Sequence, residues 1–128
     1  MKNKSLPSLK NIQKIRKLCR KGDYNKALEF LDSTVPDEGY TEEILICKAN
    51  LIELADTDYS LQDVEDILII ASNNYPDSAD VHFEMGKFLE IIKGDTKNAL
   101  KCYKRARMIL ENDLNKVVEA IGECENEI

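Results

Sequence analysis

Apolar residues recur at intervals of three or four along almost the whole chain, and this spacing constrains the fold more than any other feature. On an α-helix such residues share one face, whereas a half-buried strand needs an alternation by two that no stretch sustains. Turn residues are scarce, with five glycines and three prolines in 128 residues. A β-sandwich or barrel needs a turn roughly every 8–12 residues. The sequence therefore predicts an all-α domain.

The periodic stretches predict six helices followed by a seventh. Thr41 stands where the third helix needs a first-turn acceptor, and either Ser78 or Asp80 does so for the fifth. Ser60 with Asp63 forms a variant of the capping box. The expected helix ends are marked by residues that stop or turn the backbone, namely Gly22, Pro36, Pro76 and Gly94. These signals divide the chain into helices joined by short loops.

One octapeptide frame, Lys-Gly-Asp, three variable residues and Ala-Leu, occurs twice. It covers residues 21–28 and 93–100, which lie 72 residues apart. Two periods of roughly 34 residues with short loop insertions would fit that distance, and residues 59–71 occupy the place of a middle copy without the Gly-Asp. Gly permits a left-handed turn after a helix, and Ala lets two helices approach closely.

The repeated residues resemble the tetratricopeptide repeat family. The resemblance rests on Gly22-Asp23-Tyr24 with Ala27-Leu28, on Gly94-Asp95 with Ala99-Leu100, and on Met85-Gly86, Tyr103, Ala106 and Pro76. The segment from Gly86 to Gly94 is one residue longer than the family's spacing. The resemblance implies one domain over residues 1–128, a right-handed superhelical solenoid of antiparallel helix pairs. It places the repeats at about 8–41, 42–78 and 79–112, and a capping helix at about 113–126.

Charge is distributed unevenly along the chain, whose net charge is −6. Residues 1–26 carry +8, residues 27–96 carry −14, residues 97–107 carry +5 and residues 108–128 carry −5. An acidic protein is a poor general binder of nucleic acid, because neutralised phosphates supply most of that affinity. Because residues 1–26 are basic, a helical repeat that associates with RNA is a less favoured alternative.

Catalytic, cofactor and metal motifs are missing from the sequence. The single histidine, His82, leaves little room for Ser-His or Cys-His chemistry, and no glycine-rich phosphate loop is present. The four cysteines form no CxxC pair. We interpret them as small apolar residues in a reducing compartment, and we expect a cytoplasmic protein that is not an enzyme and holds no metal or cofactor. No apolar run approaches the ~20 residues that cross a bilayer.

In the tetratricopeptide repeat family, the first helix of each pair lines a concave groove that binds a peptide or helix of a partner protein. The residues expected there are Ile12, Arg16 and Cys19, then Asn50 and Glu53, then Phe83, Lys87 and Glu90. The resemblance therefore implies a protein–protein interaction module or adaptor. The alternative is a structural scaffold that assembles from copies of itself, since its ends carry opposite charge.

Overall fold

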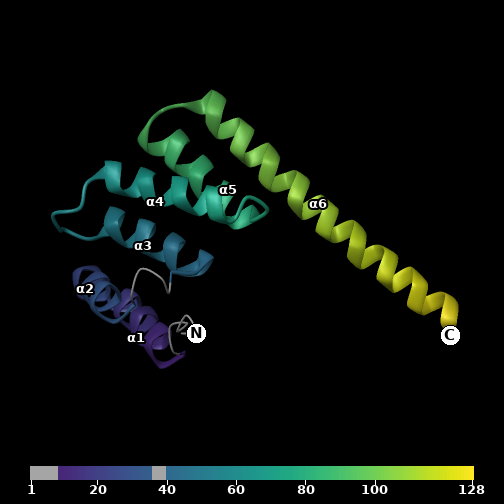
Figure 1. The fold of residues 1–128 in the computed structure, drawn as a ribbon, viewed down its shortest axis with the longest axis horizontal. Coiled ribbons are helices and arrows are strands. Elements are labelled where there is room, and N and C mark those ends of the chain that lie inside the picture. The colour runs from purple at the N-terminus through teal and green to yellow at the C-terminus, as the bar shows by residue number, and fades with distance from the viewer. Residues whose placement is uncertain (1–8, 36–39) are drawn as a thin grey trace, which may run out of the picture. The chain divides into compact units, whose positions relative to one another are not determined.

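The computed structural model of the protein describes residues 9–35 and 40–128, and the described residues contain six α-helices, one π-helical turn and no strand (Figure 1). The elements are α1 (Leu9–Arg20), α2 (Tyr24–Thr34), α3 (Glu42–Leu54), α4 (Leu61–Asn74), α5 (Ala79–Lys87), η2 (Phe88–Ile92) and α6 (Thr96–Glu127). The prediction of an all-α chain is confirmed. Pro36, expected just after the second helix, lies outside the described residues.

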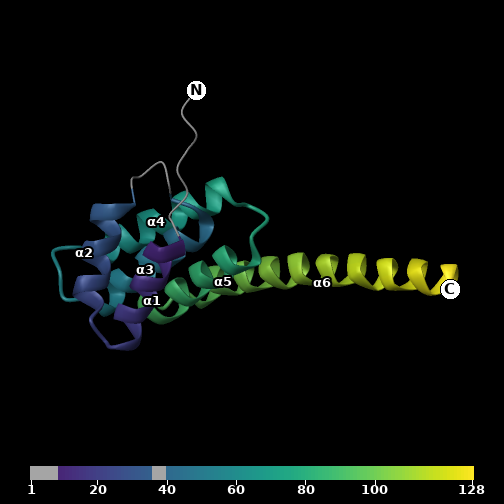
Figure 2. The ribbon, with the colours of Figure 1, turned by 90° about the horizontal axis from the view of Figure 1, so that it is seen from below.

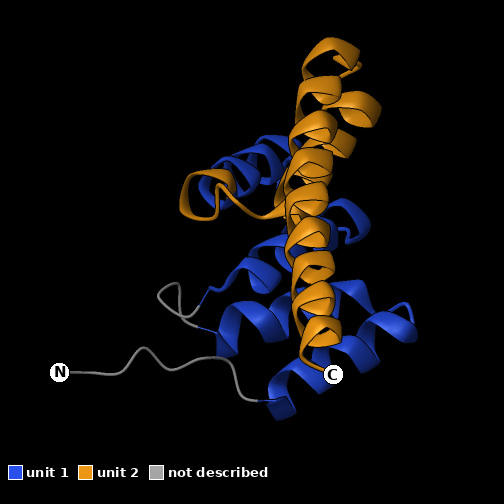
Figure 3. Ribbon diagram, turned by 90° about the vertical axis from the view of Figure 1, so that its right-hand side faces the viewer, with its two compact units in different colours: residues 1–71 blue, residues 72–128 orange. Residues whose placement is uncertain are grey.

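The chain divides into two compact units, residues 1–71 and residues 72–128, coloured separately in Figure 3. In the first unit α1 packs against α2, and α2 packs against α3. In the second unit α5 and η2 pack against α6. The first unit buries mostly leucine, isoleucine and valine, and the second buries Val81, Phe88, Ala99 and Ala106. The second unit therefore has a small core built around one helix pair.

Three helices begin at the capping residues that the sequence indicates. The hydroxyl of Thr41 accepts a hydrogen bond from the Ile44 N–H at 3.4 Å, and Ser78 accepts one from Val81 at 3.1 Å. The Ser60 N–H donates to the Asp63 carboxylate at 2.7 Å, and a hydrogen bond of 3.3 Å joins the Asp63 N–H to the Ser60 hydroxyl. Each cap satisfies backbone N–H groups that the first helical turn leaves without partners.

The two Gly-Asp turns have the backbone that the repeated frame predicts. Gly22 and Gly94 both have positive φ, at 77° and 66°, and no other described residue does. After α1, the Asp23 N–H donates to the Leu18 carbonyl at 3.0 Å, which closes a Schellman-type helix end. Only glycine takes this conformation at little cost, because a side chain would clash with the neighbouring carbonyl.

The turn before α6 contains one extra residue, and η2 accommodates it. The Lys93 N–H donates to the Phe88 carbonyl, five residues back, at 3.3 Å. The Asp95 N–H then reaches the Leu89 carbonyl, six residues back, at 2.8 Å. A π-helical turn is the usual way to fit one additional residue into a helix without breaking it. The π-helical turn therefore absorbs the extra residue between Gly86 and Gly94, and Gly94 keeps its expected positive φ.

The predicted break between a sixth helix and a capping helix near residues 112–113 is wrong. The structure has one continuous helix, α6, of 32 residues (Figures 1 and 2). Neither glycine nor proline occurs between Thr96 and Ile121, so no residue interrupts the backbone hydrogen bonds. In Figure 2 the end of α6 extends well beyond α5 within the second unit.

Helices α5 and α6 approach each other closely at Gly86. A Cβ atom built on Gly86 would lie 2.6 Å from Cε1 of Tyr103, far inside van der Waals contact. Gly86 is buried, and so are Ala99 and Ala106 on the facing helix. Small residues on both helices therefore let their axes come together, and the ring of Tyr103 lies directly over the glycine.

Gly86→Ala should lower the free energy of unfolding by about 1–2 kcal/mol, because the ring of Tyr103 must move and the gain in helix propensity offsets only part of the cost. Urea unfolding measures it. Gly122→Ala is the control, since a Cβ there meets no atom within 4 Å. It should not lower the free energy of unfolding. In a Tyr103→Ala background the penalty at Gly86 should disappear. An equal penalty in both backgrounds would show that the close contact is not its cause.

Candidate functional site

The eight residues predicted to line a groove fall into both units. Five of them lie in the first unit, and three lie in the second. The first set comprises Ile12, Arg16, Cys19, Asn50 and Glu53, and the second comprises Phe83, Lys87 and Glu90. Each set is described within its own unit below.

In the first unit, Arg16 of α1 forms an ion pair with Glu43 of α3 at 2.7 Å. Both side chains are more than half exposed. Cys19 of α1 is half-buried and lies close enough to Cys47 of α3 to affect its ionisation. Arg16 and Cys19 of α1 thus both interact with residues of α3.

The other three residues of this set show no common arrangement. Ile12 is half-buried on α1, Asn50 is half-buried on α3, and Glu53 is exposed near the end of α3. The first unit therefore contains no single surface that gathers all five predicted residues.

The thiol of Cys47 is held in its protonated form. Burial, together with the nearby Cys19 and Glu43, raises its pKa to about 11, although the guanidinium of Arg16 acts in the opposite direction. A thiolate is the reactive form of cysteine, so this environment makes Cys47 a poor nucleophile at neutral pH. The interpretation of the cysteines as apolar packing residues agrees with this.

In the native protein Cys47 should react with a thiol reagent at pH 8 far more slowly than after unfolding, because its pKa is raised and its side chain is half-buried. Mass spectrometry of peptides after a timed alkylation measures the rate at each cysteine. Cys124 is exposed and should react fastest of the four. Alkylation of Cys47 as fast as that of Cys124 would contradict this environment.

A second cluster in the first unit surrounds Lys48. Its ammonium lies 3.0 Å from the Asp32 carboxylate and within about 5 Å of the ring centres of Tyr40 and Tyr59. Burial opposes the charged form of Lys48, but hydrogen bonds to Asp32, Tyr59 and Tyr40 outweigh it and raise its pKa. The Tyr59 hydroxyl also donates to Asp32 at 2.6 Å, which raises the pKa of that phenol. These contacts connect α2 and α3 with the segments just before and just after α3.

Lys48→Met should lower the free energy of unfolding by about 1–2 kcal/mol, because Asp32 loses its cation in a partly buried position. Lys14→Met is the matched control, since Lys14 is exposed and lies 4.4 Å above the Phe30 ring. It should cost at most about 0.5 kcal/mol. Equal losses for the two variants, measured by urea unfolding, would show that the Lys48 cluster adds no stability of its own.

In the second unit, the three predicted residues surround Tyr103. The Phe83 and Tyr103 ring centres are 5.8 Å apart, and the Lys87 ammonium lies 5.2 Å above the Phe83 ring. The Tyr103 hydroxyl donates to the Glu90 carboxylate at 3.0 Å, and burial together with Glu90 raises the pKa of the phenol. The sequence predicts that these residues point away from the paired helix. Phe83 and Glu90 instead contact Tyr103 of that helix, while Lys87 contacts Phe83 and Glu84 of its own helix.

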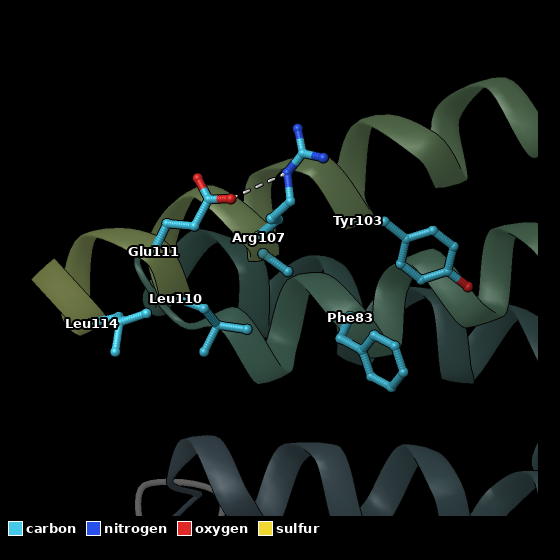
Figure 4. A pocket seen from close by; sticks show the side chains of 7 residues that line it. Phe83, Tyr103, Arg107, Leu110, Glu111 and Leu114 are labelled. Carbon is cyan, nitrogen blue, oxygen red and sulfur yellow. Dashed lines mark ion pairs between the residues drawn. The ribbon is translucent and has the colours of Figure 1, made fainter.

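An open hollow of about 510 Å³ adjoins this cluster. It is lined by Phe83 of α5 and by residues of α6, namely Tyr103, Ala106, Arg107, Leu110, Glu111 and Leu114. Figure 4 shows Phe83, Leu110 and Leu114 pointing to the same side. The Arg107 guanidinium turns away from them and pairs with Glu111 at 3.7 Å. The floor of the hollow is therefore apolar, and the charged groups lie at its edge.

The apolar face continues along α6 beyond the hollow. Leu110, Leu114, Val117 and Ile121 follow each other at intervals of four, three and four, which keeps them on one side of a helix. Each of them is more than half exposed. An ion pair of 3.5 Å between Arg105 and Asp77, just before α5, marks where that helix begins beside α6. The later part of α6 therefore has no helix of this unit against it within the described residues.

Sequence reasoning missed Tyr103, Leu110 and Leu114 as members of this surface. Tyr103 was assigned to packing within a repeat, and the leucines were divided between two helices. The sequence does contain a signal for this surface, because the apolar spacing of four and three continues without a break across the predicted boundary at residues 112–113.

The single histidine makes a local contact. The Nε2 atom of His82 lies 2.7 Å from the Pro76 carbonyl, to which it donates. Among residues 9–35 and 40–128, no three His, Cys, Asp or Glu side chains are grouped so that they could hold a metal ion. No helix in the same ranges has an apolar stretch long enough to cross a membrane.

No protein-family model matches the chain, and neither a curated protein nor a solved structure gives a significant match.

Proposed function

We propose that this chain is a non-catalytic, cytoplasmic protein-interaction module that binds a helical segment of protein along the apolar face of its second unit. We call this surface the α6 face, and it comprises Phe83, Tyr103, Leu110, Leu114, Val117 and Ile121. The helix pairs of both units are, in this proposal, repeats of the tetratricopeptide type within a superhelical solenoid.

The continuous exposure of the α6 face is the observation that carries the proposal. Four consecutive apolar positions of α6 are more than half exposed. Full burial of one such side chain contributes about 1.5–3 kcal/mol, so a face of this kind is costly to leave in water. Exposed contiguous apolar surfaces mark interaction sites in soluble proteins. Its shape, a long helix beside an aromatic ring, suits a helical ligand that presents apolar residues at matching intervals.

The repeat architecture is supported by the likeness of the two Gly-Asp turns. Both place a glycine at positive φ. In both, the alanine that follows, Ala27 or Ala99, is at most 1% exposed and donates its N–H to the aspartate carbonyl at 3.0 Å. Equivalent chemistry at equivalent positions favours two copies of one structural unit.

The charge distribution of α6 favours self-assembly as the second candidate. Its first part, residues 97–107, carries +5, and residues 108–128 carry −5. By contrast, the basic helix α1 is a weaker candidate for RNA, because Arg16 is paired with Glu43 and Lys14 lies over the ring of Phe30.

A photo-crosslinking amino acid placed at Phe83 should form adducts with discrete proteins in living cells of the native host. The same group placed at Asn112, on the opposite side of α6, is the control and should form few. Mass spectrometry identifies each adduct, including adducts with the chain itself. Absence of any protein adduct at position 83, or an identical pattern at both positions, would overturn the proposed surface.

A further inference from the structure

We infer that the helix bound on the α6 face is α6 of a second copy of this chain, running in the opposite direction. This inference rests on the proposed function and names the partner of the same surface. It is argued from two features of α6, namely the spacing of its apolar residues and the separation of its charges.

The apolar residues of α6 follow the pattern of a coiled coil. In a coiled coil, positions separated alternately by three and four residues face the partner helix. From Tyr103 onward those positions are Tyr103, Arg107, Leu110, Leu114, Val117, Ile121, Cys124 and Ile128. Arg107 alone is charged, and its guanidinium already points to the rim and pairs with Glu111. Its aliphatic stem can remain in an apolar contact while the charge stays in water.

The charges of α6 decide the direction of the partner. A parallel pair would place the basic part, residues 97–107, against another basic part, and the acidic part against another acidic part. In an antiparallel pair, the basic part of each helix, which carries +5, lies alongside the acidic part of the other helix, which carries −5. Opposite charges along a helix interface favour one orientation, and like charges oppose the other. The helix is therefore complementary to itself only in the antiparallel direction.

Antiparallel registers that differ by seven residues all match the coiled-coil positions, and charge selects among them. The register in which Leu110 faces Leu114 of the second copy sets residues 97–107 against residues 117–127, which carry −4. If Leu110 faces Leu114 of the second copy, each step forward on one helix is a step back on the other. Tyr103 then faces Ile121 of the second copy, and Arg107 faces Val117. The exposed end of each helix thus covers the hollow beside Phe83 of the other copy.

The two-fold symmetry of this arrangement closes the assembly at two copies. The same surface is used by both chains, so no complementary surface is left to recruit a third along α6. This differs from the head-to-tail scaffold considered from the sequence, in which a basic first segment would attract an acidic end and the chain of contacts would continue.

Sedimentation equilibrium tests the partner. The full chain should be a dimer at micromolar concentration, and Leu114→Glu should weaken its dimerisation at least tenfold. Asn112→Glu is the matched control, since it adds the same charge on the opposite side of α6, and it should leave the dimer within about twofold. A monomeric wild-type chain, or equal effects of the two variants, would overturn the inference.

Disulfide formation tests the direction and register. In the antiparallel register, position 100 of one copy faces Cys124 of the other, so Leu100→Cys should give an interchain disulfide between residues 100 and 124 on oxidation. Lys101→Cys, one residue away and off the interface, is the control and should give little. The two native Cys124 residues would lie about 36 Å apart, as 24 positions at about 1.5 Å each separate them. A disulfide joining Cys124 to Cys124 would instead show a parallel pair and overturn the inference.

A charge-exchange experiment tests the electrostatic argument. Lys101→Glu with Lys104→Glu should weaken the dimer, and Glu123→Lys with Glu125→Lys should do the same. Mixing the two double variants should restore association, because opposite charges again meet. Failure of the mixture to associate, while each variant stays helical by circular dichroism, would contradict the antiparallel pairing.

The inference and the proposed function fail in different ways. A monomer that still forms adducts at position 83 with another protein would overturn the inference and leave the proposed function standing. A chain with no protein adduct and no dimer would overturn both. Adducts only with the chain itself, together with the disulfide between residues 100 and 124, are the result that we expect.

Discussion

The close contact between Gly86 and Tyr103 determines how the second unit is built. Because a Cβ on Gly86 would lie 2.6 Å from the Tyr103 ring, glycine is the residue that lets α5 and α6 approach this closely. On the same helix as Tyr103, Ala99 and Ala106 are also buried. The neighbouring side of α6 is consequently left outside the pair, beside Phe83. The apolar surface of this unit is a direct result of which side of α6 the small residues occupy.

The length of α6 leaves that surface exposed beyond the end of α5. An isolated helical segment in water is only marginally stable, because nucleation is costly and little packing compensates for it. The end of α6 is such a segment, and its apolar side chains Leu114, Val117 and Ile121 are more than half exposed. Pairing with another helix would bury those side chains and support the segment at once. Its charge separation, basic then acidic, adds direction to an interaction that apolar contact alone would leave undirected.

Much of the local structure could be predicted from the sequence, while one boundary and part of the site could not. The caps at Thr41, Ser60 and Ser78 form as expected, since each depends on residues three positions apart. The family resemblance implies a helix boundary near residue 112, although no residue there interrupts a helix. That error separated Leu110 from Leu114 and concealed the stripe they share.

By itself, the sequence determined the helical class, the glycine-dependent turns at Gly22 and Gly94 and the opposite charges along α6, because these depend on neighbouring residues and on composition. Only the tertiary structure decided that Phe83 meets Tyr103 and that the stripe beginning at Leu110 remains exposed. Helical periodicity identifies an apolar side of a helix without saying what covers it. That depends on where the paired helix begins and ends, and here α5 is too short to cover the whole length of α6.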